Sequence, residues 1–354
     1  MKIGLLGQAH TRPARQWVEP VNDSREWMRV LGGGDILNYQ HVVSRPEILS
    51  DYDIVIIELT PKTHLLPRFI KRHTPSVFCL GLVEGRVEYV VRSNEEMEGL
   101  FEFCRIVNDV DMLGVLVERT VPYYRLYARL PERVQWIGIP YPNDLTDEHR
   151  QPAASERDLI LELGSVMDRN GVANLLVLRE LQRRFQTLQG RVYYYMERER
   201  QIAEGLGIRA DFRKPRRWRD YYKDHLSSFA LLCMDDRRTW GRYVLDCAAA
   251  RMPFVGSELS HCGEHVGILT CDPFDTDRAI EYLSALIEER LAGSSEFYDS
   301  ITARQYEALQ DYGTENSLRR FCAALERVGY SGLARRLKSS INLPTKKLND
   351  SRIR

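Results

Sequence analysis

The sequence lacks an excess of charge of either sign. Its 354 residues contain 50 lysine and arginine residues against 50 aspartate and glutamate residues, so the formal net charge at pH 7 is zero. Proteins that bind nucleic acids or anionic membranes through bulk charge carry a basic surplus. The charge balance therefore gives no reason to expect a nucleic-acid partner, and none is predicted.

Paired cysteines and long apolar runs are also lacking. The seven cysteines are scattered, mostly inside short apolar stretches, and no two of them form a C-x-x-C pair. This pattern indicates reduced thiols in a cytoplasmic protein and argues against disulfides and zinc. No apolar run approaches membrane-spanning length, and the amino end MKIGLLG is too short for the core of a signal peptide. Neither a metal nor another cofactor is predicted.

What the sequence does contain is an alternation of strand and helix patterns that occurs twice. Continuous apolar runs such as residues 53–59 (DIVIIEL) are followed by helical patterns, and the alternation restarts at residue 159. Apolar strands that alternate with helices are typical of parallel sheets buried on both faces. We therefore predict an α/β fold with two Rossmann-like, doubly wound domains that face a cleft.

Composition sets the predicted boundaries. The stretch PYPNDLTDEHRQPAASE contains three prolines and no periodicity, which favours a linker between the domains. The last residues are basic and rich in serine, asparagine and lysine, as in loosely held chain ends. The prediction is an N-terminal domain over residues 1–140, a linker over 141–156, a C-terminal domain over 157–331 and a flexible basic tail over 332–354.

One stretch, residues 228–257 (SFALLCMDDRRTWGRYVLDCAAARMPFVGS), organises the second half. It reads as strand, loop, helix and strand, with Pro253 ending the helix. The loop at residues 237–241 would lie at the carboxyl end of a buried strand and at the start of a helix. Open parallel sheets bind ligands at that place, and the free backbone N–H groups of a helix start favour an anion.

Three motifs in the second half resemble the donor domain of GT-B glycosyltransferases, in particular the retaining family 4, also called glycosyl transferases group 1. Residues 159–176 (LILELGSVMDRNGVANLL) are similar to the family's strand and G-R-x-x-x-x-K-G loop. Residues 238–255 (RTWGRYVLDCAAARMPFV) are similar to E-G-F-G-x-x-x-L-E-A-x-A-x-G-x-P-V, and residues 260–266 (SHCGEHV) to G-G-x-x-E-x-V. The resemblance implies a GT-B fold and glycosyl transfer from a nucleotide diphosphate-sugar to an unidentified acceptor, without a metal.

The resemblance also implies a set of site residues. The positions that match the family's donor-binding motifs are Gly164, Ser165, Arg169, Asn170, Thr239, Trp240, Gly241, Asp246 and Glu264. The chain departs from the motifs where the E-x7-E pair aligns with Arg238 and Asp246, and where the loop's arginine and lysine align with Ser165 and Asn170. We expect Arg169 and Arg238 to replace the lost cations at the diphosphate, and His10 to be an acceptor-side base.

Each of these roles has a structural alternative. Arg238 could be a surface arginine paired with Asp235 or Asp236, His10 a turn histidine, and Glu264 a helix-start charge. The lost cations leave open a binding or scaffold protein with this fold and no transferase activity. A nucleotide-sugar epimerase is a further alternative, and a nucleic-acid binder comes last.

Two basic segments remain. Residues 209–223 (RADFRKPRRWRDYYK) interleave basic and aromatic side chains, and residues 335–354 form a basic end. Residues 209–223 suit single-stranded nucleic acid or an anionic surface, and the basic end suits peripheral contact with an anionic membrane surface. The alternatives are a solvated helix face bordering the cleft for residues 209–223 and a disordered end for residues 335–354.

Overall fold

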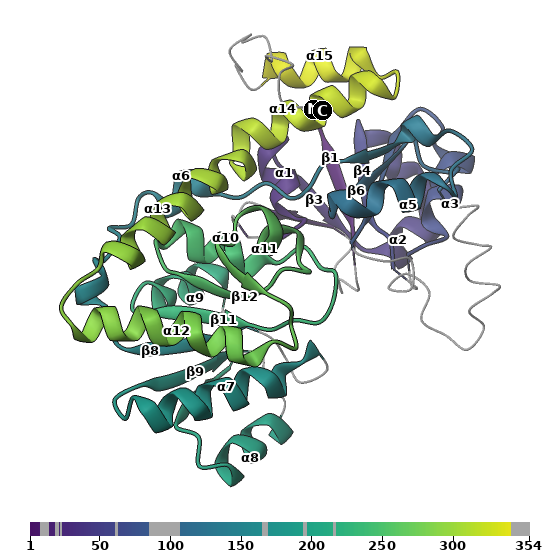
Figure 1. Ribbon diagram of the computed structural model, residues 1–354. Helices are drawn as coiled ribbons and strands as arrows, with labels where there is room; N and C mark the ends of the chain where they lie inside the picture. The colour runs from purple at the N-terminus through teal and green to yellow at the C-terminus, as the bar shows by residue number, and fades with distance from the viewer. Residues whose placement is uncertain are drawn as a thin grey trace.

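Two parallel sheets form the framework of the protein. The computed structural model describes residues 1–7, 14–17, 21, 23–60, 63–84, 107–164, 169–193, 197–214 and 217–340, with residues 14–17 described by their backbone. The N-terminal sheet and its helices lie in the upper part of Figure 1, and the C-terminal sheet lies below them. No helix in the described ranges is long and apolar enough to cross a membrane.

The N-terminal sheet has seven strands in the order β2-β3-β1-β4-β5-β6-β7. Its pairs are parallel except that β2 runs antiparallel to β3. The strands are β1 Ile3–Leu6, β2 Ala14–Trp17, β3 Gly34–Leu37, β4 Ile54–Glu58, β5 Phe78–Val83, β6 Met112–Val115 and β7 Val134–Trp136. β1, β5 and β6 are buried along their whole length, and β4 is buried up to its last residue. Their continuous apolar sequences are therefore explained by helices on both faces.

The C-terminal sheet has six strands, all parallel, in the order β10-β9-β8-β11-β12-β13. The strands are β8 Ile160–Leu163, β9 Gln189–Tyr193, β10 Ala210–Arg213, β11 Ala230–Cys233, β12 Phe254–Ser257 and β13 Leu269–Cys271. Counted within the domain, this order is 3-2-1-4-5-6, the order of a doubly wound sheet. The strand order reverses between β8 and β11, so ligands are expected at the carboxyl ends of these two strands.

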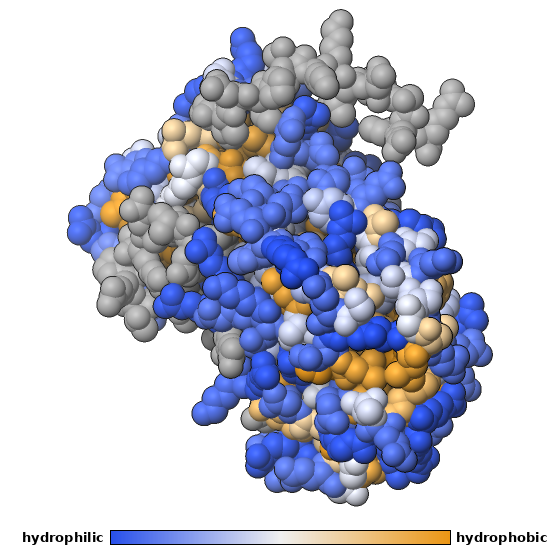
Figure 2. Space-filling view, turned by 90° about the vertical axis from the view of Figure 1, so that its left-hand side faces the viewer, coloured by the Kyte–Doolittle hydropathy of each residue, from blue (hydrophilic) through white to orange (hydrophobic). Residues whose placement is uncertain are grey.

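Helices cover the faces of both sheets. The α-helices are α1 Glu26–Val30, α2 Tyr39–Ser44, α3 Leu66–His73, α5 Val121–Arg125, α6 Asn143–Thr146, α7 Gly171–Arg184, α8 Glu197–Gly205, α9 Trp218–His225, α10 Arg242–Ala249, α11 His261–His265, α12 Thr276–Leu291, α13 Glu296–Leu309, α14 Thr314–Arg327 and α15 Ser331–Ser340. Short 3-10 turns lie at Pro46–Asp51, Glu118–Thr120, Pro131–Arg133, Ala154–Glu156 and Gln310–Tyr312. The face in Figure 2 is mainly hydrophilic, with apolar residues gathered over the lower part, at the height of the C-terminal domain.

The end of the chain returns to the N-terminal domain. In Figure 1, α14 and α15 run across the top of the molecule beside the first sheet. The rings of Phe321 on α14 and Trp27 on α1 lie 5.1 Å apart, and the Tyr330 hydroxyl donates to Asp111 Oδ1 at 2.6 Å. One cluster of buried apolar side chains consequently includes residues of both domains.

The predicted flexible tail is wrong for its first residues. Residues 331–340 form α15, in which Leu333, Ala334 and Leu337 are buried. These three residues recur at helical spacing and lie on one face, whereas the basic residues that suggested a loose end lie on the other. The rest of the predicted tail, residues 341–354, lies outside the described residues. The domain boundaries themselves remain a prediction.

The predicted linker contains ordered interdomain contacts. Tyr141 is completely buried, and its backbone N–H donates to Tyr312 O at 2.7 Å. Its hydroxyl donates to Asp246 Oδ1 at 3.0 Å, so it joins the linker to α10. The absence of periodicity in this stretch reflects single anchoring side chains rather than a freely moving connection.

The buried face of α15 provides a test of this packing. Leu337→Ala removes a fully buried side chain and should lower the free energy of unfolding by about 2–5 kcal/mol. Arg335→Ala changes an exposed residue on the same helix and should stay within about 0.5 kcal/mol of wild type. Urea unfolding measures both values. Equal, small effects of the two substitutions would show that α15 does not stabilise the fold.

Candidate functional site

A pocket of about 360 Å³ lies between the two domains. The residues on its N-terminal wall lie at or just after the carboxyl ends of strands β4 to β7, or precede α1. Those on its C-terminal wall precede α7 or lie at the start of α10. The polar residues that line it are Asp23, Ser24, Glu58, Thr60, Glu84, Arg169, Thr239 and Arg242. The pocket therefore lies where the carboxyl ends of both sheets meet, the usual ligand site of such sheets.

The N-terminal wall carries three carboxyl groups. Glu58 is the last residue of β4 and accepts a hydrogen bond from the Ser24 hydroxyl. Asp23 is held by Arg25, whose Nε lies 2.9 Å from both carboxylate oxygens. Glu84 follows β5 and accepts the backbone N–H of Trp240 at 2.9 Å, which links it to the opposite domain.

The C-terminal wall carries two arginines. Arg242 is the first residue of α10, where the helix dipole adds positive potential. Arg169 precedes α7 and lies 3.6 Å from Asp235, with its side chain 42 % exposed. Burial raises the pKa of Asp235 to about 6, against the opposing effects of the Arg237 N–H and Arg169. An anion between the two arginines would find charge and backbone donors on the same side of the pocket.

Trp240 connects the two walls. Its ring stacks on His261 at a centroid distance of 5.0 Å, and its edge packs against Gly138 of the N-terminal domain. A Cβ on Gly138 would lie 2.8 Å from the Trp240 ring, and the glycine has φ +65°. Burial, with His265, Arg320 and Arg119, lowers the pKa of His261 to about 3, so this imidazole is neutral at physiological pH. It serves as a packing partner for Trp240.

Of the predicted site residues, the structure brings Arg169, Thr239 and Trp240 together in the pocket. Arg238 is half-buried and makes no hydrogen bond or ion pair with any residue that the structure describes. Its predicted alternative, a pair with Asp235 or Asp236, is not formed. Arg238 does not line the pocket, although the next residue, Thr239, does.

Four other predicted residues have structural contacts. The Asn170 side-chain amide donates to Met234 O at 3.0 Å and Pro273 O at 2.7 Å. Gly241 has φ +82° at the start of α10, and Gly164 follows β8 beside Cys233. Glu264 forms an ion pair with Arg119 of the N-terminal domain. Ser165 and His10 lie outside the described residues.

Asp246 is turned away from the pocket. Its Oδ1 accepts the Tyr141 hydroxyl at 3.0 Å and the Trp218 Nε1 at 2.9 Å, and the residue is 3 % exposed. In this arrangement the carboxylate is occupied by two donors, and its role as a nucleotide ligand stays a prediction.

The sequence reasoning missed the carboxylates of the N-terminal wall and Arg242. A signal was present, because Glu58 and Glu84 each end an apolar strand (DIVIIEL and VFCLGLVE). Polar residues at the carboxyl ends of parallel strands meet at one edge of a sheet. Only the position of the C-terminal domain shows that this edge faces a second set of polar residues.

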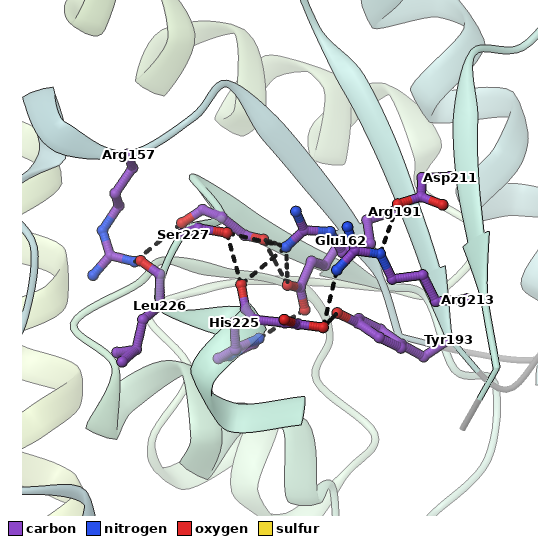
Figure 3. Close-up of polar contacts among 11 residues, drawn as sticks. Arg157, Glu162, Arg191, Tyr193, Asp211, Arg213, His225, Leu226 and Ser227 are labelled. Carbon is purple, nitrogen blue, oxygen red and sulfur yellow. Dashed lines mark hydrogen bonds and ion pairs between the residues drawn. The ribbon is translucent and has the colours of Figure 1, made fainter. Parts of the chain in front are cut away.

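A second polar cluster lies inside the C-terminal domain (Figure 3), and none of the residues labelled there lines the pocket. Glu162 on β8 is 1 % exposed and accepts from the Ser228 hydroxyl at 2.6 Å. His225 Nδ1 lies 2.7 Å from Glu162 Oε2. Arg191 Nη1 lies 3.5 Å from Oε1, the oxygen that also accepts from Ser228. Burial alone would raise the pKa of Glu162, but His225, Ser228 and Arg191 together hold it below its usual range.

The same network extends to the surface through the basic segment predicted over residues 209–223. Arg213 donates to Asp211 at 2.6 Å and to Asp224 at 2.9 Å. Arg213 and Asp211 are at the right of Figure 3. Arg209 donates to the carbonyl of Gln186 at 2.7 Å. Both guanidinium groups are bound within the fold. This favours the alternative in which residues 209–223 border the cleft over a basic patch that is free to bind an anionic surface.

The described residues contain no group of three or more His, Cys, Asp or Glu side chains that could hold a metal ion. No family model and no curated protein matches the sequence. Its fold does match solved structures. HepE of Anabaena in complex with UDP and glucose is 11 % identical, with a TM-score of 0.69 over 92 % of this chain and 99 % of that chain.

Two further solved structures share the architecture. Sucrose-phosphate synthase of Thermosynechococcus elongatus is 13 % identical, with a TM-score of 0.66 over 96 % of this chain and 100 % of that chain. A variant of TarM of S. aureus in complex with UDP is 11 % identical, with a TM-score of 0.65 over 83 % of this chain but only 60 % of that chain. These structures are GT-B glycosyltransferases, and the predicted GT-B fold is confirmed.

The Glu162 cluster gives a stability prediction. Glu162→Gln leaves Arg191 and His225 buried without their carboxylate, so the free energy of unfolding at pH 7 should fall by about 3–5 kcal/mol. Because the folded-state pKa is lowered, the contribution of Glu162 is complete above about pH 4.3 and declines as the pH falls further. The gap between wild type and variant, measured by urea unfolding, should therefore narrow below that pH.

Glu281→Gln is the matched control. Glu281 is 64 % exposed and paired with Arg278, so its loss should change stability by less than about 0.5 kcal/mol. If the difference in the free energy of unfolding between wild type and Glu162→Gln widened in acid, the lowered pKa of Glu162 would be contradicted.

Proposed function

We propose that the protein is a glycosyltransferase that moves a sugar from a nucleotide diphosphate-sugar to an acceptor. The observation that carries the proposal is the pocket itself, in which Arg169, Arg242 and the start of α10 face Glu58 and Glu84 across the domain boundary. A cationic wall suits the donor diphosphate, and a carboxylate wall suits the hydroxyl groups of an acceptor.

The cationic wall would stabilise the leaving diphosphate. Charge that develops on the diphosphate as the glycosidic bond breaks is best stabilised by donors that are already in place. The α10 terminus contributes about 0.3–2 kcal/mol, whereas a hydrogen bond from a charged arginine contributes about 1.5–3 kcal/mol. Arg169 and Arg242 therefore supply the larger share, and Arg238, which has no partner among the described residues, is a third cation at the edge of this wall.

Departures from the family 4 motif fit a modified donor site. Arg238 cannot accept a hydrogen bond from a sugar hydroxyl, as a glutamate at that position would. Asp246 is enclosed by Tyr141 and Trp218, so the ribose would be held by other groups. Likeness to HepE and TarM, whose structures contain UDP, supports a nucleoside diphosphate as the group to be bound.

A second candidate is a binding protein with this fold and no transferase activity. The enclosure of Asp246 and the arginine at position 238 favour it, because both groups of the E-x7-E pair are lost as donor ligands. The two candidates differ in whether a nucleoside diphosphate binds at the arginines.

Nucleotide binding can be measured by thermal shift with UDP, GDP, ADP and dTDP. A transferase should be stabilised by one of them, by about 2.7 kcal/mol at 100 times the dissociation constant. Arg242→Ala and Arg169→Ala should each weaken that nucleotide by about 10- to 100-fold, because each removes a charged hydrogen bond.

Arg278→Ala is the control, since Arg278 lies on α12 with its side chain 51 % exposed and paired with Glu281. It should bind the nucleotide as wild type does. Absence of a shift with all four nucleotides would contradict the transferase and favour the binding protein. A shift that neither pocket arginine affects would place the nucleotide elsewhere.

A further inference from the structure

We infer that Glu84 competes with the donor diphosphate for the start of α10, so that its carboxylate has to leave when the diphosphate binds there. The inference rests on the proposed function, because it concerns the regulation of the same donor site. It gives a role to a residue of the N-terminal domain that no motif in the sequence marks.

The carboxylate of Glu84 reaches across the domain boundary to the donor wall. Glu84 directly follows β5, and its Oε1 accepts the Trp240 backbone N–H at 2.9 Å. Trp240 lies in the turn before α10, which begins at Arg242 after its N-cap residue Gly241. Backbone N–H groups at a helix start are those that bind a phosphate. A carboxylate of the protein itself therefore holds one of the donors on the wall that we assign to the diphosphate.

Arg242 is under the influence of the same carboxylate. Burial alone would lower the pKa of Arg242, but Glu84 and, to a smaller extent, Asp23 hold it above its usual range. A nearby negative charge stabilises a guanidinium in this way. Glu84 thus acts on both the backbone and the side-chain cation that would bind the diphosphate.

Glu84 differs in this respect from the other two carboxylates of the N-terminal wall. Asp23 is bonded to Arg25, and Glu58 accepts from Ser24, so the partners of both lie in their own domain. The Glu84 hydrogen bond instead ends in the C-terminal domain. It is therefore the hydrogen bond that a diphosphate at α10 would replace directly.

The two anions cannot share the start of α10 without repelling each other. Glu84 is an exposed residue, so its carboxylate can turn into water without becoming a buried charge. The diphosphate also gains Arg169, which lies 3.6 Å from Asp235 and lines the same pocket. The exchange therefore lowers the affinity for the diphosphate without preventing its binding.

Titration calorimetry tests the competition, with pyrophosphate and with the nucleotide diphosphate that the thermal shift selects as ligands. Glu84→Ala removes the competing carboxylate and should bind both ligands about 10- to 100-fold more tightly than wild type, the range for one hydrogen bond to a charged group. Glu84→Gln should show a smaller gain, because its amide oxygen still accepts the Trp240 N–H but carries no charge. A gain in affinity cannot come from a variant that fails to fold.

Two controls separate competition from less specific effects. Arg119→Gln breaks the ion pair with Glu264, which crosses the same domain boundary, and Arg119 does not line the pocket. Glu47→Gln removes one negative charge outside the pocket, from a residue that is 63 % exposed and paired with Arg45. Both variants should bind pyrophosphate and the nucleotide as wild type does.

The outcomes distinguish this inference from the proposed function. If neither wild type nor Glu84→Ala binds pyrophosphate or any nucleotide, the transferase is overturned, and the role of Glu84 with it. If wild type binds the nucleotide and Glu84→Ala binds it equally or less tightly, competition is overturned and the transferase remains. An equal gain in Arg119→Gln or Glu47→Gln also overturns competition, because a looser domain contact or bulk charge would then explain it. Tighter binding of pyrophosphate by Glu84→Ala, with no nucleotide bound, supports competition at α10 but overturns the nucleotide donor.

Discussion

The contact of Trp240 with the N-terminal domain is the interaction on which the pocket depends. The backbone N–H of this residue holds Glu84, and its ring is enclosed by Gly138, His261 and Tyr312. The loop that begins α10 is thereby fixed against the carboxyl ends of β4 and β5. Without this contact the two walls would each be an ordinary sheet edge, and Arg242 would have no carboxylates opposite it. The neutrality of His261 is part of the same packing, since a charged imidazole would be costly when buried near Arg320 and Arg119.

The two walls of the pocket carry opposite charges, carboxylates on the N-terminal side and arginines on the C-terminal side, and an anionic ligand would interact with both. Glu84 and Asp23 both attract Arg242. A bound diphosphate would compete with these carboxylates for the arginine and would add negative charge beside them. An anion on the arginine wall would therefore weaken the attraction between Arg242 and the carboxylates opposite it.

Periodicity predicted the two sheets, because strands buried on both faces have continuous apolar sequences that are legible without a structure. It did not predict the contacts that join the domains. Tyr141 lies in a stretch without periodicity, and α15 is short and basic apart from Leu333, Ala334 and Leu337. Sequence spacing likewise predicted Arg169 and Trp240 as site residues, and both line the pocket. The position of Glu58 at the end of an apolar strand was a signal, but only the fold shows that this strand end faces Arg169 and Arg242, more than a hundred positions away.

Asp246 shows how a motif position can change its use while the fold is kept. Aspartate is one methylene shorter than the glutamate of the motif, and its carboxylate lies between Tyr141 and Trp218 inside the domain interface. A buried carboxylate is tolerated only with donors of this kind, and both donors here come from other segments of the chain. A longer side chain would press against the two rings or displace them. Asp246 therefore ties the linker to α10.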